Sequence, residues 1–186
     1  MKLTRVQVGV AVFWLFCVAA VGVWWWRDVP KPISEMDRGF VVHRVEDLQQ
    51  LPELQWEAQN HTLVSLKGGK EPWTLVHFWA TWCAPCVDEI PELLTFAKKQ
   101  IGRVRVIAVS LDESWEDAKK IAPPPNVSPN WFNVLDSQSK TPSLFGSYQF
   151  PETYLLDSKR RIHAKWIGPQ PWASSEVEEW FSELSP

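Results

Sequence analysis

The chain has 186 residues, of which 45% are hydrophobic and 22% are charged, and its formal net charge is −3. These values are typical of a globular protein and exclude a fully disordered or a collagen-like chain. Basic residues form no stripe interleaved with aromatic residues, so we expect no nucleic-acid partner. The length that remains after the apolar N-terminal segment suffices for one domain with a hydrophobic core but hardly for two.

Residues 6–26 are an uncharged, mostly apolar run, VQVGVAVFWLFCVAAVGVWWW. As a helix, a run of this length can cross a hydrocarbon core of about 30 Å. Three consecutive tryptophans at positions 24–26 end the run where an interfacial aromatic belt is expected. We therefore predict one N-terminal transmembrane helix over residues 6–26, with residues 1–5 in the cytoplasm. A signal peptide cleaved after Ala20 is the alternative.

Beyond this segment, the sequence alternates strand and helix patterns. Residues 27–50 are predicted to be a linker and an N-terminal extension, in which a short helix or an edge strand remains open. The run WTLVHFW is typical of a central strand that is buried on both faces. The predicted strands are 54–58 and 62–66, which form a hairpin, then 73–79, 104–110, 131–135, 153–156 and 162–167, and the predicted helices are 83–100, 114–121 and 174–184. This order predicts an α/β fold with a central mixed β-sheet flanked by helices.

Cys83 and Cys86 form a C-x-x-C pair between the predicted central strand and the helix that follows. At the start of a helix, unpaired N–H groups and the helix dipole favour the thiolate of Cys83. Cys86 is close enough to form a disulfide with it, and Pro85 suits an early helical position. We therefore expect Cys83 to attack a substrate disulfide as the nucleophile and Cys86 to resolve the mixed disulfide. The alternatives are an inert bridge or a zinc half-site. Zinc needs two further ligands, and no second C-x-x-C occurs, so we expect neither metal nor cofactor.

The segment FWATWCAPC, residues 78–86, resembles the active-site signature of thioredoxin-fold proteins. The longer pattern resembles the membrane-anchored TlpA/ResA-type thiol-disulfide oxidoreductases and their cytochrome c maturation relatives. Residues 86–91 (CVDEIP) match the C-x-x-E-x-P that opens the first helix of this branch. Residues 106–113 (VIAVSLDE) resemble its second core strand, and residues 150–153 (FPET) resemble its cis-proline loop. The resemblance implies a thioredoxin-like redox domain over residues 51–186, with the hairpin as an N-terminal extension.

Two further residues acquire roles from the resemblance. Glu89, three residues after Cys86 on about the same helical face, corresponds to a buried acid that accepts the proton of the resolving thiol. A poorly solvated carboxylate beside a thiol is expected to have a raised pKa, as such a base requires. The alternative is a surface glutamate in an acidic patch with Asp88 and Glu92. His77 stands where thioredoxins carry a buried aspartate. It could pass protons to Cys86, but we favour a simple buried hydrogen bond.

The resemblance also implies a substrate-binding surface around the cysteine pair, made by Trp82, Ala84, Pro85, Phe150, Pro151 and Glu152. In the family, the cis-proline, here Pro151, offers the backbone of the preceding residue as an edge to which an extended substrate segment pairs. Many relatives have a smaller or β-branched residue where this chain has Phe150, so the preferred substrate remains open. Glu152 either tunes the site or is a solvated loop charge.

We therefore predict a single-pass inner-membrane protein whose redox domain faces the periplasm or an equivalent extracytoplasmic space, where disulfides persist. By resemblance, it reduces protein disulfides by dithiol–disulfide exchange. Apocytochrome c is the leading candidate substrate, and a membrane thiol reductase of the DsbD/CcdA type is the expected electron donor. A disulfide-forming oxidase or isomerase on the same fold remains open. The two-residue cysteine spacing disfavours a Sco-like copper-delivery protein, and the intact Trp82, Glu89 and Pro151 disfavour a non-catalytic adaptor.

Overall fold

The computed structural model describes residues 39–46 and 49–185. The predicted cytoplasmic N-terminus (residues 1–5), the predicted transmembrane helix (residues 6–26) and residues 27–38 of the predicted linker lie outside the described part. No helix within residues 39–46 and 49–185 is long and apolar enough to span a membrane.

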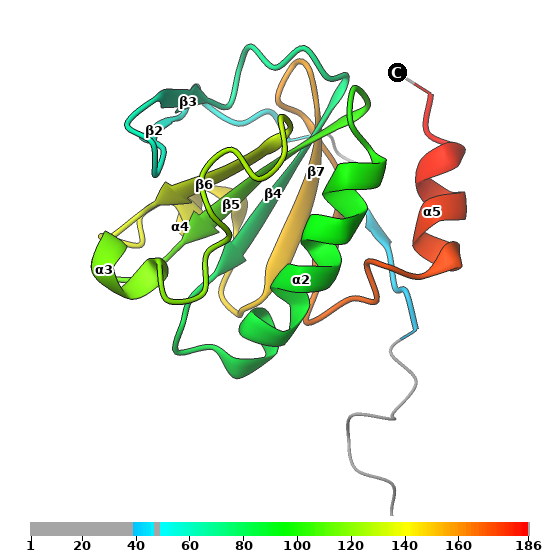
Figure 1. Ribbon diagram of the computed structural model, residues 1–186. Coiled ribbons are helices and arrows are strands. Elements are labelled where there is room, and N and C mark those ends of the chain that lie inside the picture. The colour runs from blue at the N-terminus through cyan, green and yellow to red at the C-terminus, as the bar shows by residue number, and fades with distance from the viewer. Residues whose placement is uncertain (1–38, 47–48, 186) are drawn as a thin grey trace, which may run out of the picture. The chain divides into compact units, whose positions relative to one another are not determined.

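A six-stranded sheet forms the centre of the described part (Figure 1). Its strands lie in the order β1 (His43–Arg44), β8 (Ile162–Ile167), β7 (Glu152–Asp157), β4 (Trp73–Trp79), β5 (Val104–Ser110) and β6 (Trp131–Leu135). β4, β5 and β6 are parallel to one another, whereas β7 is antiparallel to β4 and β8, and β1 is antiparallel to β8. The predicted α/β fold with a mixed central sheet is therefore confirmed.

The predicted hairpin is present beside one edge of this sheet. Its strands, β2 (Gln55–Glu57) and β3 (Leu63–Ser65), are antiparallel and form a small sheet of their own. A bridge between Ala58 and Val134 connects the hairpin to the edge strand β6. The buried indole of Trp56 also donates a hydrogen bond to the Thr141 hydroxyl at 3.2 Å. The hairpin thus shields an edge strand whose backbone groups would otherwise face solvent.

The central strand β4 leads directly to the cysteine pair. All seven of its residues are buried, as expected of a strand that is covered on both faces. After a short loop, α2 (Ala84–Lys99) begins with Cys83 as its N-cap residue and Pro85 in its first turn. Lys98 and Lys99 lie in its last turn, where positive charge suits the helix dipole.

Two helices cover one face of the sheet. His77 on β4 and Trp166 on β8 lie in register across β7, so their side chains share this face. Trp166 packs against Phe181 of α5 (Ser175–Ser182) and against Trp172, which in turn contacts Phe96 of α2. The α2 and α5 helices therefore lie over the side of β4 that carries His77.

The other face is covered by a helix that the sequence does not predict. Phe78 and Tyr154 point to this side and pack against Phe145 of α4 (Thr141–Phe145), with ring centroids 5.1 and 5.0 Å apart. α3 (Trp115–Ala118) is shorter than the predicted helix at 114–121 and is capped by the Ser114 hydroxyl. Helices thus flank the sheet on both faces, as predicted.

Candidate active site

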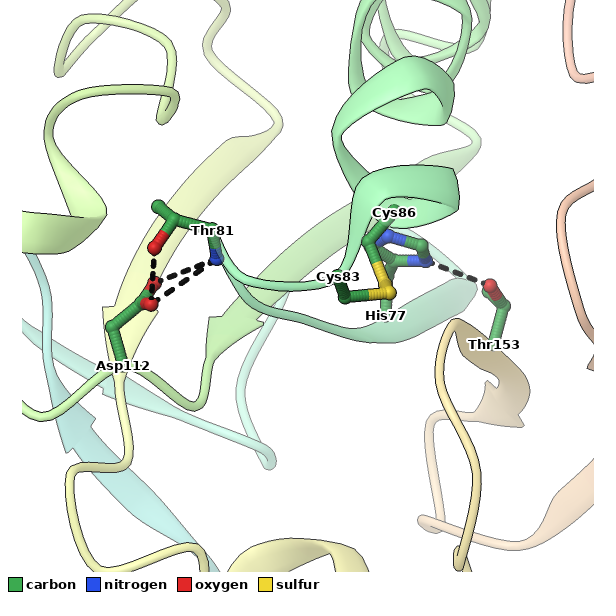
Figure 2. The surroundings of a disulfide bond; sticks show 6 residues. All are labelled: His77, Thr81, Cys83, Cys86, Asp112 and Thr153. Carbon is green, nitrogen blue, oxygen red and sulfur yellow. Dashed lines mark hydrogen bonds between the residues drawn. A yellow bond between two sulfur atoms is a disulfide. The ribbon is translucent and has the colours of Figure 1, made fainter.

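The C-x-x-C pair lies where β4 is followed by α2 (Figure 2). Cys83 and Cys86 are joined by a disulfide, with their Cα atoms 5.3 Å apart. Cys83 is 7% exposed, whereas Cys86 is fully buried in the first turn of α2. Of the two cysteines, only Cys83 therefore keeps contact with solvent, so an incoming thiol or disulfide can reach this residue first.

Most of the predicted substrate-binding residues gather around this pair. Trp82 is 66% exposed, and Ala84 and Pro85 are exposed as well. The Trp82 ring meets the half-buried ring of Phe150 edge to face, with the centroids 6.1 Å apart. The Phe150–Pro151 peptide bond is cis, and Pro151 is buried. The loop before β7 is thus brought next to the Trp-Cys segment, although the two are far apart in the sequence.

Glu152 is not part of this exposed surface. It is the first residue of β7, is 2% exposed and lies in register with Phe78, on the face that α4 covers. Its carboxylate accepts a hydrogen bond from the Tyr154 hydroxyl at 3.0 Å. Burial and the charge of Glu152 raise the pKa of Tyr154, so the phenol keeps the proton that it donates. Of the two interpretations of Glu152, the solvated loop charge is therefore wrong, and a role in tuning the site stays a prediction.

Glu89 is buried rather than part of a surface patch. It lies on α2 three residues after Cys86 and is 1% exposed. Its Oε1 atom accepts a hydrogen bond from the backbone N–H of Gln170 at 3.2 Å and another from the indole N–H of Trp172. The alternative of a surface glutamate is thus wrong, because the side chain is buried. The two N–H donors offset the cost of burying the carboxylate.

His77 faces α2 from the middle of β4 and is fully buried. Its Nδ1 atom lies 2.9 Å from the hydroxyl oxygen of Thr153 on the neighbouring strand (Figure 2). Burial lowers the pKa of His77 to about 3, so the imidazole is uncharged at neutral pH. This geometry favours the buried hydrogen bond over a proton-shuttle role.

A buried carboxylate that the sequence does not single out fixes the loop before Cys83. Asp112, after the end of β5, is 3% exposed. It accepts hydrogen bonds from the Thr81 backbone N–H at 3.1 Å, from the Thr81 hydroxyl at 2.6 Å and from the Ser110 hydroxyl at 2.7 Å (Figure 2). The segment VIAVSLDE contains Asp112, but the pattern indicates only a strand and a turn. The residue therefore ties the active-site loop to the neighbouring strand.

Known proteins resemble the chain over most of the described part. Residues 48–165 match the family model described as the AhpC/TSA family. The thioredoxin-like protein YneN of Bacillus subtilis is 26% identical over 124 residues, which cover 67% of this chain and 73% of YneN. The thiol-disulfide oxidoreductase ResA of Geobacillus thermodenitrificans is 28% identical over 109 residues, which cover 57% of this chain and 59% of ResA. The structure of a DsbF homologue from Corynebacterium diphtheriae shares the fold, with a TM-score of 0.64 and 19% identity over 81% of this chain and 97% of that chain.

Proposed function

The chain belongs to the AhpC/TSA family, in which it is similar to thiol-disulfide oxidoreductases of the ResA type, and on that basis we propose that it is a membrane-anchored, extracytoplasmic protein-disulfide reductase. One observation carries the proposal. The Cys83–Cys86 disulfide lies at the N-terminal end of α2, one helical turn before the buried carboxylate of Glu89. Disulfide exchange needs only the two sulfurs and a proton acceptor, so the reaction requires no metal and no cofactor.

Cys83 is the proposed nucleophile. In the reduced protein its sulfur lies at the start of α2, where unpaired N–H groups and the helix dipole stabilise the thiolate. The thiolate attacks one sulfur of a substrate disulfide, forms a mixed disulfide with it and releases the other sulfur as a thiolate. The exposed ring of Trp82 beside Cys83 offers the approaching segment an apolar surface.

Cys86 completes the exchange with the help of Glu89. The thiol proton of Cys86 passes to the Glu89 carboxylate, and the Cys86 sulfur attacks the sulfur of Cys83. The protein disulfide forms again, and the second substrate sulfur leaves as a thiolate. Two electrons have then moved from the dithiol to the substrate. The proton on Glu89 passes to a leaving thiolate or to water.

The proposed substrates are proteins that present an extended, disulfide-bearing segment to the surface around Trp82 and Phe150. Apocytochrome c is the proposed partner, because its haem-attachment C-x-x-C must be reduced. A membrane thiol reductase of the DsbD/CcdA type is the proposed electron donor. The predicted helix over residues 6–26 would anchor the chain in the inner membrane, with the redox domain in the periplasm.

Trapping of the mixed disulfide tests this proposal. The full-length Cys86→Ser variant, reduced and mixed with a synthetic peptide that carries a C-x-x-C-H disulfide, should gain the mass of one peptide. The Cys83→Ser variant should gain none. Both are compared in a Cys17→Ala background, because Cys17 in the predicted membrane segment is the third cysteine of the chain and could otherwise react. Equal trapping by the Cys83→Ser variant would contradict the assignment of the nucleophile.

A further inference from the structure

Trp172 is a buried tryptophan that no sequence motif singles out, and it contacts the proposed proton acceptor. Its Nε1 atom donates a hydrogen bond to Oε1 of Glu89, and the backbone N–H of Gln170 donates to the same oxygen at 3.2 Å. The indole is fully buried, and Glu89 is 1% exposed. N–H donors stabilise the ionised form of a carboxylate in a place where water is largely excluded.

The indole ring of Trp172 is held in place independently of Glu89. It packs against Phe96 of α2 and Trp166 of β8, with both centroid distances at 5.5 Å, and against Phe40 at 6.4 Å. The backbone N–H of Trp172 also donates to the carbonyl of Gln170 at 2.9 Å. The direction of the indole N–H is therefore set by packing before Glu89 takes part in any reaction.

We propose that Trp172 is a positioning residue for the proton transfer from Cys86, because its indole N–H keeps Glu89 ionised and oriented to accept the thiol proton. This inference rests on the proposed function of the site. Trp172 acts through Glu89 and lies in the segment between β8 and α5, so the C-terminal part of the chain takes part in the chemistry of α2. Among the residues of β4, the titratable side chain that faces α2 is His77. Between α2 and α5, Lys99 and Glu178 form an ion pair that is partly exposed to solvent. Burial lowers the pKa of His77 to about 3, so it stays uncharged in the range of the test.

The pH dependence of the rate tests the proposal. The reduced full-length protein is mixed with oxidised glutathione, and the rate of reduction is followed from pH 4 to pH 9 for the unmodified protein, Glu89→Gln and Trp172→Phe. Phenylalanine keeps an aromatic ring in the cluster but has no N–H. At acidic pH the rate of the unmodified protein should fall as Glu89 takes up a proton, and Glu89→Gln should abolish this acid limb of the pH profile. In Trp172→Phe the midpoint of the limb should move up by about one pH unit, which slows the reaction about tenfold at a given pH on the limb. An unmoved limb overturns the inference.

Trp166→Phe is the matched control. Trp166 is as deeply buried as Trp172 and belongs to the same aromatic cluster. The Nε1 atom of Trp166 has no hydrogen-bond partner among the described residues, whereas that of Trp172 donates to Glu89. The control should therefore leave the limb in place. If Trp166→Phe moves the limb as far as Trp172→Phe does, the effect comes from packing and the inference is wrong.

A second measurement does not depend on the folding of Trp172→Phe. In the NMR spectrum of the unmodified protein, one indole N–H signal should shift with pH at the midpoint of the acid limb, and this shift should be lost in Glu89→Gln. The absence of such a signal overturns the inference. The proposed function fails separately. The proposed function is wrong if Cys83→Ser reduces oxidised glutathione as fast as the unmodified protein, and this result does not depend on the pH profile of Trp172→Phe.

Discussion

Asp112 offers a direct test of how the loop before Cys83 is held. Asp112→Ala removes the acceptor of three donor groups at once, which are the Thr81 N–H, the Thr81 hydroxyl and the Ser110 hydroxyl. The carboxylate is 3% exposed, and Ser110 is buried with it. After the substitution, these N–H and hydroxyl donors lack a protein acceptor, and water can satisfy only some of them.

The expected loss of stability follows from these contacts. A hydrogen bond to a charged group contributes about 1.5–3 kcal/mol, and a neutral one contributes about 1 kcal/mol. Alanine also relieves the cost of burying the polar carboxyl group, which offsets part of the sum. We expect Asp112→Ala to lower the free energy of unfolding by about 2–4 kcal/mol. Asp112→Asn keeps one acceptor oxygen, so the loss should be about half as large.

Urea unfolding of the oxidised full-length protein measures this difference. Asp88→Ala, an exposed carboxylate on α2, is the control and should change the free energy of unfolding by less than about 0.5 kcal/mol. The rate of thiol exchange at Cys83 should fall in Asp112→Ala, because the loop that carries the nucleophile loses its attachment to β5. A loss below about 1 kcal/mol with an unchanged m-value would contradict this expectation, since the three hydrogen bonds would then be dispensable.

Three further predictions concern charge and surface. Burial favours a higher pKa for Asp157, but hydrogen bonds from Arg161 and His163 outweigh it and hold the value at about 2. The stability that Asp157 provides is therefore full above about pH 4 and lost as the pH falls toward 2. The free energy of unfolding of Asp157→Asn, measured in urea, should equal that of the unmodified protein only near pH 2 and be lower above about pH 4. Burial lowers the pKa of His77 to about 3, so between about pH 6.5 and 3 only the unfolded chain takes up a proton at this residue. The stability linked to neutral His77 is therefore full above about pH 6.5 and is lost as the pH falls. His77→Asn should thus lose less stability between pH 6.5 and 4 than the unmodified protein, and an equal slope would contradict the burial argument. Trp82→Ala should leave the free energy of unfolding within about 0.5 kcal/mol but lower kcat/KM for insulin disulfides roughly tenfold, because Trp82 is 66% exposed beside Cys83.

The sequence predicts the long elements of the fold because their patterns are local. The run at 73–79 is almost continuously apolar, and the helix after Cys83 has buried residues at helical spacing, so both signals lie within the segment itself. The two-residue strand β1 has no such pattern, and it is a strand because His43 pairs with Lys165 of β8. α4 is too short to show a helical period. Its only local signals are a proline in its first turn and Gly146 at its C-terminal end, with φ at 68°.

The same distinction applies to the candidate site. Cys83, Cys86 and Glu89 lie within seven consecutive positions of one motif, so their roles can be proposed from sequence. Asp112 and Trp172 come from other parts of the chain. Asp112 reaches the loop before Cys83 because β5 pairs with β4, and Trp172 reaches Glu89 because the segment before α5 lies against α2. No spacing along the chain indicates those contacts. The sequence leaves open whether Glu152 is a solvated loop charge for a related reason. It does not show that β7 begins at this residue and that the side chain is buried on the face that α4 covers.

The reduction potential of the Cys83–Cys86 couple distinguishes a disulfide reductase from a disulfide-forming oxidase. The full-length protein in detergent is equilibrated in graded thiol buffers, and the fraction of dithiol is measured by alkylation, with Cys17→Ala as the background. We expect a value near or below that of thioredoxin, about −270 mV, because a reductant must donate electrons to the disulfides of other proteins. A value near that of the strong oxidant DsbA, about −120 mV, would contradict it and assign the protein to disulfide formation.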